Sequence, residues 1–391
     1  MNDDRYENKI TYFYNNIEVR KIINAAGTLT SLGGNRISSN VLNSMKQISQ
    51  IFVDMEKLSR DVGNHIANRL GVEAAYVTAS GSAGIVLSII AATYRLKSSS
   101  YDNPVDTDNE NYVAIQRIQK SEFRSLVNFA DARIIEYGDE NNASEDSLIY
   151  LLTKYRNKIV AILHFVFDPL PGSLPLKNVI NIAHSFNIPV IVDAAAELPP
   201  KENLTKFVNM GADAVVFSGG KMIGSLSNSG IVLGSSDFIK SISNIGPLME
   251  KDCNNNPKIY PGRPMKTSKE ILIATASALD EFLELDEKEW MDNLKNINNM
   301  ILNEINQNTN IASASIVSPK WYHPRPAIIP RVEIKLKNNL SVDKLRDRLK
   351  HNLIYVYTDE NMVYINPQCL EEKDVPALVS NIITCLEEIN Y

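Results

Sequence analysis

Three segments of the sequence place chemically capable residues directly after runs of apolar, strand-forming residues. Lys221 ends the segment AVVFSGGK (214–221), Asp193 follows PVIV, and the segment SGS (80–82) follows AAYVTA. Ligands of open parallel sheets bind beyond the carboxyl ends of the strands, so polar residues at these points are the first candidates for a binding site. Their chemistry would be anion binding and nucleophilic catalysis.

Each segment also has an ordinary structural interpretation. Ser80 or Ser82 could cap the helix that follows, and Asp193 could cap the next helix. A lysine in a loop, such as Lys221, is usually solvated. Asp193 is the more informative residue, because a carboxylate that follows three β-branched residues is costly to bury without a partner.

Taken together, the three segments contain the parts that hold pyridoxal phosphate. The small-residue loop and the start of the helix behind it would bind the phosphate through backbone N–H groups. Asp193 would keep the pyridine nitrogen protonated, and Lys221 would form the Schiff base. Gly219 and Gly220 would let the backbone approach the cofactor, and Ser218 could donate a further hydrogen bond to the phosphate. The order of these residues therefore predicts a pyridoxal-phosphate site.

The elements that must position these residues alternate along the chain. From about residue 70, short runs rich in Val, Ile and Ala alternate with segments of helical period, which predicts an α/β fold with a mainly parallel sheet buried on both faces. The expected strands are 74–79, 112–117, 132–137, 159–166, 189–195, 214–219 and 230–234. The expected helices between them are 82–96, 147–156 and 176–186. The polar tract 98–111 is expected to be a surface loop.

The C-terminal part of the chain predicts a second, smaller domain. A long helical pattern over 271–305 would link it to the large domain. The segments RVEIKL, VDKLRDRLK, IYVYT and MVYINP, followed by a closing helix, predict a small α/β layer. We therefore expect an N-terminal segment and large cofactor-binding domain in 1–285 and a small domain in 286–391.

Composition excludes several classes of protein. The net charge is -6, and no block of basic residues is present, which argues against a nucleic-acid partner. The acidic N-terminus does not resemble a signal peptide, and no run is long enough to cross a bilayer, so we expect a cytoplasmic protein with no membrane partner. Cys253, Cys369 and Cys385 show no CxxC spacing, which predicts buried thiols and no metal site.

Longer segments carry a resemblance to a known family. The chain resembles the selenocysteine synthase-like branch of fold type I pyridoxal-phosphate enzymes, which includes L-seryl-tRNA(Sec) selenium transferases and D-glucosaminate-6-phosphate ammonia-lyase. The matching segments are IINAAGTLTSLGG (22–34), VEAAYVTASGSAG (72–84), LPGSLPLKNVINIAHSFNIPVIVDAAAELPP (170–200), MGADAVVFSGGK (210–221) and YPGRPMKTSKE (260–270). The resemblance implies an aspartate aminotransferase-like fold, with a seven-stranded sheet in the large domain.

The resemblance also implies roles for individual residues. It implies Lys221 as the Schiff-base lysine, Asp193 as the partner of the pyridine nitrogen, and Ser80, Gly81, Ser82 and Ser218 around the phosphate. Gly262 and Arg263 resemble a segment that reaches an active site across a subunit interface, which implies a homodimer or a multiple of it. A structural loop arginine is the alternative for Arg263.

Candidates for substrate contact are more numerous than those for the cofactor. Arg331, at the start of an expected strand, could hold an α-carboxylate or form a strand-end salt bridge. His164 lies inside an apolar strand, where a satisfied core residue is more common than a catalyst. The full set of candidates is Arg263, Gln119, Arg331, Arg325, His164, Asp168 and Arg117.

Departures from the family pattern concern the substrate. Gly224, Tyr357 and Gln368 stand where family members carry arginine, and Gln116-Arg117-Ile118-Gln119 lacks the histidine of a QRGH-like run. The missing arginines predict a substrate with less negative charge than a sugar-acid phosphate. The INAAGT motif begins at Ile23, which leaves no room for the N-terminal region that holds tRNA and makes an aminoacyl-tRNA substrate unexpected.

Several reactions are open to such a site. We expect an external aldimine with a small amino acid or amine, abstraction of the Cα proton, and β-elimination or β-replacement. An aminotransferase or an O2-using oxidase of a biosynthetic pathway is the alternative within the same cofactor class. A binding protein that has lost catalysis is the alternative from another class, although retention of Asp193 and Lys221 argues against it.

Overall fold

The chain forms two compact units in the structure, which is a computed structural model. It describes residues 10–12, 17–96, 110–167, 170–248, 260–308, 311–318, 325–337, 340–359 and 362–390. The larger unit comprises 35–284, and the smaller unit combines 1–34 with 285–391. Cys253, Asp168 and most of the tract 98–111 lie outside the described residues.

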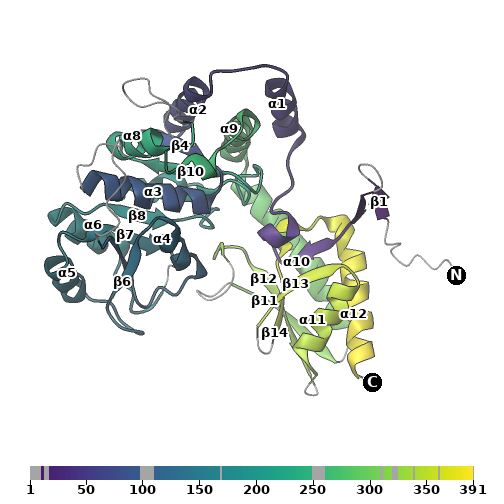
Figure 1. The fold of residues 1–391 in the computed structure, drawn as a ribbon. Coiled ribbons are helices and arrows are strands. Elements are labelled where there is room, and N and C mark those ends of the chain that lie inside the picture. The colour runs from purple at the N-terminus through teal and green to yellow at the C-terminus, as the bar shows by residue number, and fades with distance from the viewer. Residues whose placement is uncertain are drawn as a thin grey trace. The chain divides into compact units, whose positions relative to one another are not determined.

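A seven-stranded sheet forms the centre of the larger unit (Figure 1). Its spatial order is β4-β10-β9-β8-β7-β5-β6. All neighbouring pairs are parallel except those of β10, which runs antiparallel to both β4 and β9. The strands are β4 (Ala74–Thr78), β5 (Tyr112–Gln116), β6 (Arg133–Tyr137), β7 (Ile159–Phe165), β8 (Val190–Asp193), β9 (Ala214–Ser218) and β10 (Gly230–Gly234). The predicted mainly parallel sheet of seven strands is therefore confirmed.

Helices surround this sheet and explain the apolar character of its strands. All residues of β7 are buried, as expected for a central strand covered on both faces. The helices are α1 (Ser39–Ser49), α2 (Met55–Leu70), α3 (Gly81–Leu96), α4 (Leu126–Phe129), α5 (Glu145–Lys154), α6 (Leu176–Ser185), α7 (Asn203–Asn209), α8 (Ser236–Ile245) and α9 (Lys269–Glu284). Helix α3 is apolar almost all round, which fits its burial in the main core.

The smaller unit is built on a five-stranded sheet of order β11-β12-β14-β13-β3. Its elements are β3 (Ile23–Ala25), α10 (Glu287–Asn308), β11 (Ala312–Val317), β12 (Arg331–Leu336), α11 (Val342–His351), β13 (Ile354–Thr358), β14 (Met362–Ile365) and α12 (Val375–Asn390), with β1 (Ile10–Tyr12) and β2 (Glu18–Arg20) as a separate pair. Strand β3 pairs in parallel with β13 and shares the core of this unit. The N-terminal segment thus packs with the C-terminal residues, whereas the sequence-based division placed it with the large domain.

The helical pattern over 271–305 is interrupted. It was expected to form one linking helix, but the structure has α9 and α10, separated by Leu285 and Asp286. Asp286 accepts hydrogen bonds from the N–H groups of Lys288 and Glu289, so it caps the start of α10. The boundary between the compact units lies at this break.

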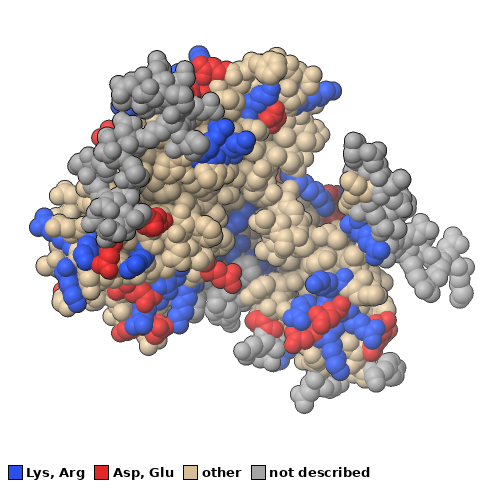
Figure 2. Space-filling view, viewed as in Figure 1, with Lys and Arg blue, Asp and Glu red and all other residues tan. Residues whose placement is uncertain are grey.

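Surface charge on the smaller unit is mixed in sign. Arg346 contacts Asp343 and Asp347 on α11, and Arg348 contacts Glu388 on α12. Figure 2 shows acidic and basic side chains interspersed there on the face in view. No helix among the described residues is long and apolar enough to cross a bilayer.

Candidate active site

The carboxyl ends of β4 and β9 meet at the start of β10. Gly230, the first residue of β10, lies opposite both Thr78 of β4 and Ser218 of β9. Strand β8, which ends at Asp193, pairs in parallel with β9. The sheet topology therefore brings the three predicted segments to one edge, although about 140 residues of sequence separate the first from the last.

Gly81 lies at the point where these segments converge. A Cβ atom at this position would lie 3.6 Å from Ala195 Cβ and 3.7 Å from Ser218 Cα and Cβ. The start of α3, the residue two positions after Asp193 and the end of β9 are thus in close proximity. A methyl group at Gly81 would make ordinary van der Waals contact with these small residues, so the lack of a side chain leaves a methyl-sized cradle there.

The turn before α3 combines a helix cap with an anion-binding geometry. Ser80 Oγ accepts a hydrogen bond from Ala83 N at 2.9 Å, and Ser80 O accepts from Gly84 N at 3.0 Å. The capping interpretation of Ser80 is therefore correct. Gly81 and Ser82 are the two residues before Ala83 and Gly84, and their N–H groups lie at the helix N-terminus, where anions are favoured.

Asp193 is a desolvated carboxylate at the end of β8. Burial raises its pKa, which a hydrogen bond from Ala195 N at 3.0 Å and the nearby charge of Lys221 partly oppose. It retains some accessible surface, yet the surrounding protein excludes most water. Such a carboxylate is a suitable partner for a buried cation.

Lys221 has the complementary property. Burial lowers the pKa of its amine, and the carboxylates of Asp193 and Glu197 raise it to a lesser extent. An amine with a lowered pKa is more often neutral and hence more nucleophilic. Sequence reasoning missed Glu197, whose only signal was a carboxylate four residues after Asp193; its burial is seen in the structure.

Gly219 and Gly220 are required by the loop that follows Lys221. A Cβ at Gly219 would lie 2.1 Å from Ser229 Oγ, and one at Gly220 would lie 2.3 Å from Ser227 Cα. Within the chain itself, these glycines permit close packing of loop 219–230. The sequence-based explanation, close approach to a cofactor, overlooked this contact.

Gln119 and His164 belong to a buried polar network. Gln119 is 1% exposed, donates to Phe165 O at 2.9 Å and accepts from Phe165 N at 3.2 Å. The His164 ring lies 3.3 Å from the amide nitrogens of Gln116 and Gln119, and burial lowers its pKa to about 4. His164 is thus a satisfied core residue, and Gln119 has a structural use beside its predicted substrate contact.

The remaining candidates have diverse surroundings. Gly262 packs so closely on α8 that a Cβ would lie 2.5 Å from Ile245 O, and Arg263 donates to Pro247 O at 3.1 Å. Arg117 is half-exposed and contacts Glu136 and Glu140. These contacts supply structural reasons for the residues, and their predicted site roles stay predictions.

Arg331 lies in the smaller unit, on β12. It is 1% exposed and donates to Ile329 O at 3.4 Å. Burial, together with the charge of Arg325, lowers its pKa to about 10, while Tyr357 opposes this shift. Its predicted contact with a carboxylate stays a prediction.

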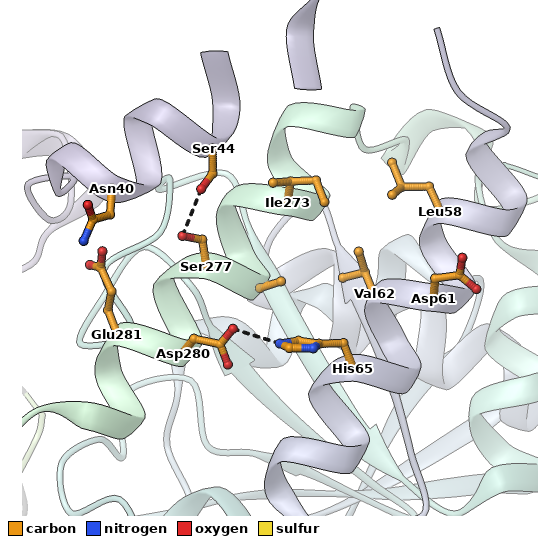
Figure 3. Close-up of a pocket in the computed structure, with 11 residues that line it drawn as sticks. Asn40, Ser44, Leu58, Asp61, Val62, His65, Ile273, Ser277, Asp280 and Glu281 are labelled. Carbon is orange, nitrogen blue, oxygen red and sulfur yellow. Dashed lines mark hydrogen bonds and ion pairs between the residues drawn. The ribbon is translucent and has the colours of Figure 1, made fainter. Parts of the chain in front are cut away.

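A separate cavity of about 550 Å³ lies among helices α1, α2 and α9 (Figure 3). His65 Nε2 lies 2.8 Å from Asp280 Oδ2, and Asp280 Oδ1 also accepts from Arg69 Nε at 2.8 Å. Ser44 Oγ of α1 donates a hydrogen bond to Ser277 Oγ of α9 at 3.3 Å, as Figure 3 shows. None of the predicted site residues lines it.

The residues at the sheet edge fit pyridoxal phosphate. The cradle at Gly81 and the α3 N-terminus suit a phosphate, and Asp193 suits a protonated ring nitrogen. Lys221 has the lowered pKa that imine formation requires. These groups therefore suit the phosphate, the ring nitrogen and the aldehyde of the cofactor.

Sequence comparisons identify enzymes as relatives, while no protein-family model matches the chain. The chain is 26% identical over 296 residues to 5'-C-glycyluridine monooxygenase-decarboxylase of Streptomyces sp, covering 73% of this chain and 69% of that enzyme. It is 26% identical over 276 residues to D-glucosaminate-6-phosphate ammonia lyase of Salmonella typhimurium, covering 69% of each. L-seryl-tRNA(Sec) selenium transferase of Alkaliphilus oremlandii is 23% identical over 252 residues, 59% of this chain and 52% of the transferase.

Solved structures confirm the fold. That of D-glucosaminate-6-phosphate ammonia-lyase has a TM-score of 0.76 at 21% identity, covering 95% of this chain and 97% of that one. A serine palmitoyltransferase variant from S. paucimobilis with a bound PLP–myriocin aldimine has a TM-score of 0.57 at 12% identity, covering 95% of this chain and 90% of that one. The chain thus has the fold of type I pyridoxal-phosphate enzymes. It is an enzyme related to the selenocysteine synthase-like branch, as the sequence motifs predicted.

Proposed function

We propose that this protein uses pyridoxal phosphate to labilise a bond at Cα of a small amino acid or an amine that resembles one. The observation that carries the proposal is the convergence of Gly81, Ala195 and Ser218 next to Asp193 and Lys221 at one sheet edge. The cofactor would supply an electron sink for negative charge developing at Cα. We favour β-elimination or β-replacement as the outcome.

Each residue at the edge has a role in this proposal. Lys221 would hold the cofactor covalently and, once displaced by the substrate amine, would accept the Cα proton at Nζ. Asp193 would hold the proton on the ring nitrogen. The N–H groups at the start of α3, with Ser80, Ser82 and Ser218, would bind the phosphate. Gly262 would line the cofactor site, and Arg263, Gln119 and Arg331 are candidates for the substrate.

Oxidation by O2 with loss of CO2 is a second candidate function. The match to a monooxygenase-decarboxylase supports it, since it extends over 73% of this chain. The same Lys221 and Asp193 would serve either reaction, because both begin with electron withdrawal from Cα. The difference would lie in whether O2 reaches the activated carbon.

The assembly and the substrate charge are part of the same proposal. The resemblance implies a homodimer or a multiple of it with shared sites, and the composition of the sequence favours a location in the cytoplasm. The absence of arginine at Gly224, Tyr357 and Gln368 favours a substrate less anionic than a sugar-acid phosphate. Sedimentation at several concentrations tests the dimer, and a monomer at all of them would contradict it.

The test of function begins with purified protein. Addition of pyridoxal phosphate should produce a visible absorbance band that borohydride reduction fixes on Lys221, as peptide mass spectrometry would show. A panel of amino acids is then assayed for ammonia, keto acid, CO2 and O2 consumption. Ammonia release without O2 uptake supports elimination, and coupled O2 uptake and CO2 release supports oxidation. A protein that takes up no cofactor would refute both.

A further inference from the structure

The backbone carbonyl of Lys221 is held by a side chain distant in sequence. Asn35 Nδ2 donates to Lys221 O at 2.9 Å, and Gly224 N donates to the same oxygen at 3.1 Å. Asn35 Oδ1 accepts from Arg36 N at 2.8 Å. The two ends of the amide therefore have chemically distinct partners, which fixes the orientation of the Asn35 side chain.

A second contact anchors the loop after Lys221 to helix α9. Thr275 Oγ1 lies 2.7 Å from Ile271 O, to which it donates, and Ser225 Oγ lies 3.2 Å from Thr275 Oγ1. Ser225 N also donates to Gly219 O at 2.8 Å. Ser225 and Thr275 are both 0% exposed, so water does not compete for these bonds.

The turn itself admits little variation. Gly224 has φ of +81°, and a Cβ there would lie 3.7 Å from Asn35 Nδ2, so Asn35 packs directly on the turn. On the N-terminal side of Lys221, close packing of Gly220 on Ser227 constrains the backbone as well. The hydrogen bond from Asn35 therefore holds a backbone segment that can adopt few other conformations.

Asn35 is also the first residue of the larger unit. The chain passes from the smaller unit to the larger one between Gly34 and Asn35, after two consecutive glycines with φ of +94° and +77°. Glycines with positive φ allow a sharp change of chain direction. The hydrogen bond to Lys221 therefore ties the start of the larger unit to the loop that carries the lysine.

We propose that Asn35 is a positioning residue for Lys221. By holding the Lys221 carbonyl from outside the loop, it fixes the backbone from which the lysine side chain extends and so the direction of its amine toward Asp193. The reactive amine must be held within a narrow geometry for covalent and proton-transfer steps. This proposal rests on the proposed function, since that function gives Lys221 its role.

The test replaces Asn35 by aspartate. Asn35→Asp keeps the size and the acceptor for Arg36 N–H but places an oxygen against Lys221 O. In the cofactor-free protein, hydrogen exchange of peptide 219–226 should become about tenfold faster. In the cofactor-loaded enzyme, kcat should fall about tenfold with KM within about twofold, as expected for loss of orientation.

Asn306→Asp is the matched control. Asn306 also donates from Nδ2 to a carbonyl, that of Ala314, and also accepts from a backbone N–H. It lies on α10 in the smaller unit. This variant should leave the exchange of peptide 219–226 and kcat unchanged.

The outcomes separate this proposal from the proposed function. If wild-type protein binds no cofactor, the proposed function fails, while exchange of peptide 219–226 in the cofactor-free protein still decides the role of Asn35. Unchanged exchange and kcat in Asn35→Asp, or equal losses in Asn306→Asp, would overturn the positioning role. Should Asn35→Asp fail to fold, Asn35→Ala is measured in the same way against the same criteria.

Discussion

Two groups of acidic and basic side chains in the larger unit have similar chemistry and opposite surroundings. At the sheet edge, Asp193 and Lys221 are desolvated, and burial shifts the pKa of each toward its neutral form. In the helical cavity of Figure 3, His65 Nε2 lies 2.8 Å from Asp280 Oδ2, and the two side chains are 45% and 37% exposed. The packed protein keeps water away from the charged groups at the sheet edge, whereas the side chains in the helical cavity remain hydrated.

This difference supports the sheet edge as the place of the proposed function. A contact between exposed side chains of opposite charge typically contributes less than about 1 kcal/mol to stability, and it needs no special packing around it. Desolvated charges cost stability unless a further partner neutralises them, and they cluster at active sites for that reason. The cavity has the volume of a ligand site. The sheet edge instead has desolvated charges, which a bound ligand could neutralise.

The largest expected effect comes from removing the amine of Lys221. Lys221→Ala should abolish the visible absorbance band and lower activity by about 10³-fold or more, because it removes both the covalent link and the proton acceptor. Absorbance titration and initial rates provide the measurement. Lys177→Ala, which removes a lysine that donates to Met210 O at 2.9 Å, should change neither. Retained activity in Lys221→Ala would refute the assignment.

A smaller loss of activity is expected when the Asp193 carboxylate becomes an amide. Asp193→Asn can still accept from Ala195 N but carries no charge, so kcat should fall about 10²-fold while the cofactor still binds. Asp280→Asn makes the same change in the helical cavity and should leave kcat within about twofold. Equal effects at both positions would break the distinction between the two groups.

Removing the desolvated charges, which should lower activity, should raise the stability of the cofactor-free protein. The double variant Asp193→Asn/Lys221→Met removes both desolvated charges and should raise the free energy of unfolding at neutral pH by about 1–4 kcal/mol. His65→Asn/Asp280→Asn should instead lower it by about 1 kcal/mol or less. Urea unfolding of all proteins at one ionic strength provides the comparison.

The pH dependence of that gain follows from the directions of the two shifts. The raised pKa of Asp193 means that its cost is present above the folded pKa and disappears as pH falls toward its ordinary value of 3.8. The lowered pKa of Lys221 means that its cost is present below the folded pKa and disappears as pH rises toward 10.5. The gain should therefore shrink as pH approaches 3.8 and as it approaches 10.5, and be greatest between these limits. A gain independent of pH would contradict this origin.

Two glycine substitutions at the sheet edge should have contrasting consequences. Gly220→Ala places a Cβ 2.3 Å from Ser227 Cα and should lower the free energy of unfolding by about 1–3 kcal/mol. Gly81→Ala meets its nearest neighbour at 3.6 Å and should leave folding within about 0.5 kcal/mol, while cofactor affinity falls about tenfold because the methyl fills the cradle. Urea unfolding and equilibrium titration with pyridoxal phosphate distinguish the two. Tight cofactor binding by Gly81→Ala would argue against the cradle.

Local sequence determined the strands of the larger unit and three of the helices between them, whereas α1, α2, α4, α7 and α8 were not predicted. The seven predicted strands and the three predicted helices are all present, because runs of Val and Ile and the apolar periodicity are properties of neighbouring residues. Local signals were weaker at the connections. The break at Leu285 and Asp286 was missed because the apolar pattern continues through it, although Asp286 is a good helix cap.

The sequence by itself also predicted which residues the proposed site would draw on, since Lys221, Asp193 and the small residues at 80–82 follow strands in a recognisable order. Only the tertiary structure decided what surrounds them. Pairing of β3 with β13 and the bond from Asn35 to Lys221 join residues distant in the chain. The contact of Gly219 with Ser229 depends on how the loop between them folds back. Burial, which shifts the pKa of Asp193 and Lys221, is likewise a property of the packed sheet edge, because desolvation depends on what lies around a group in space.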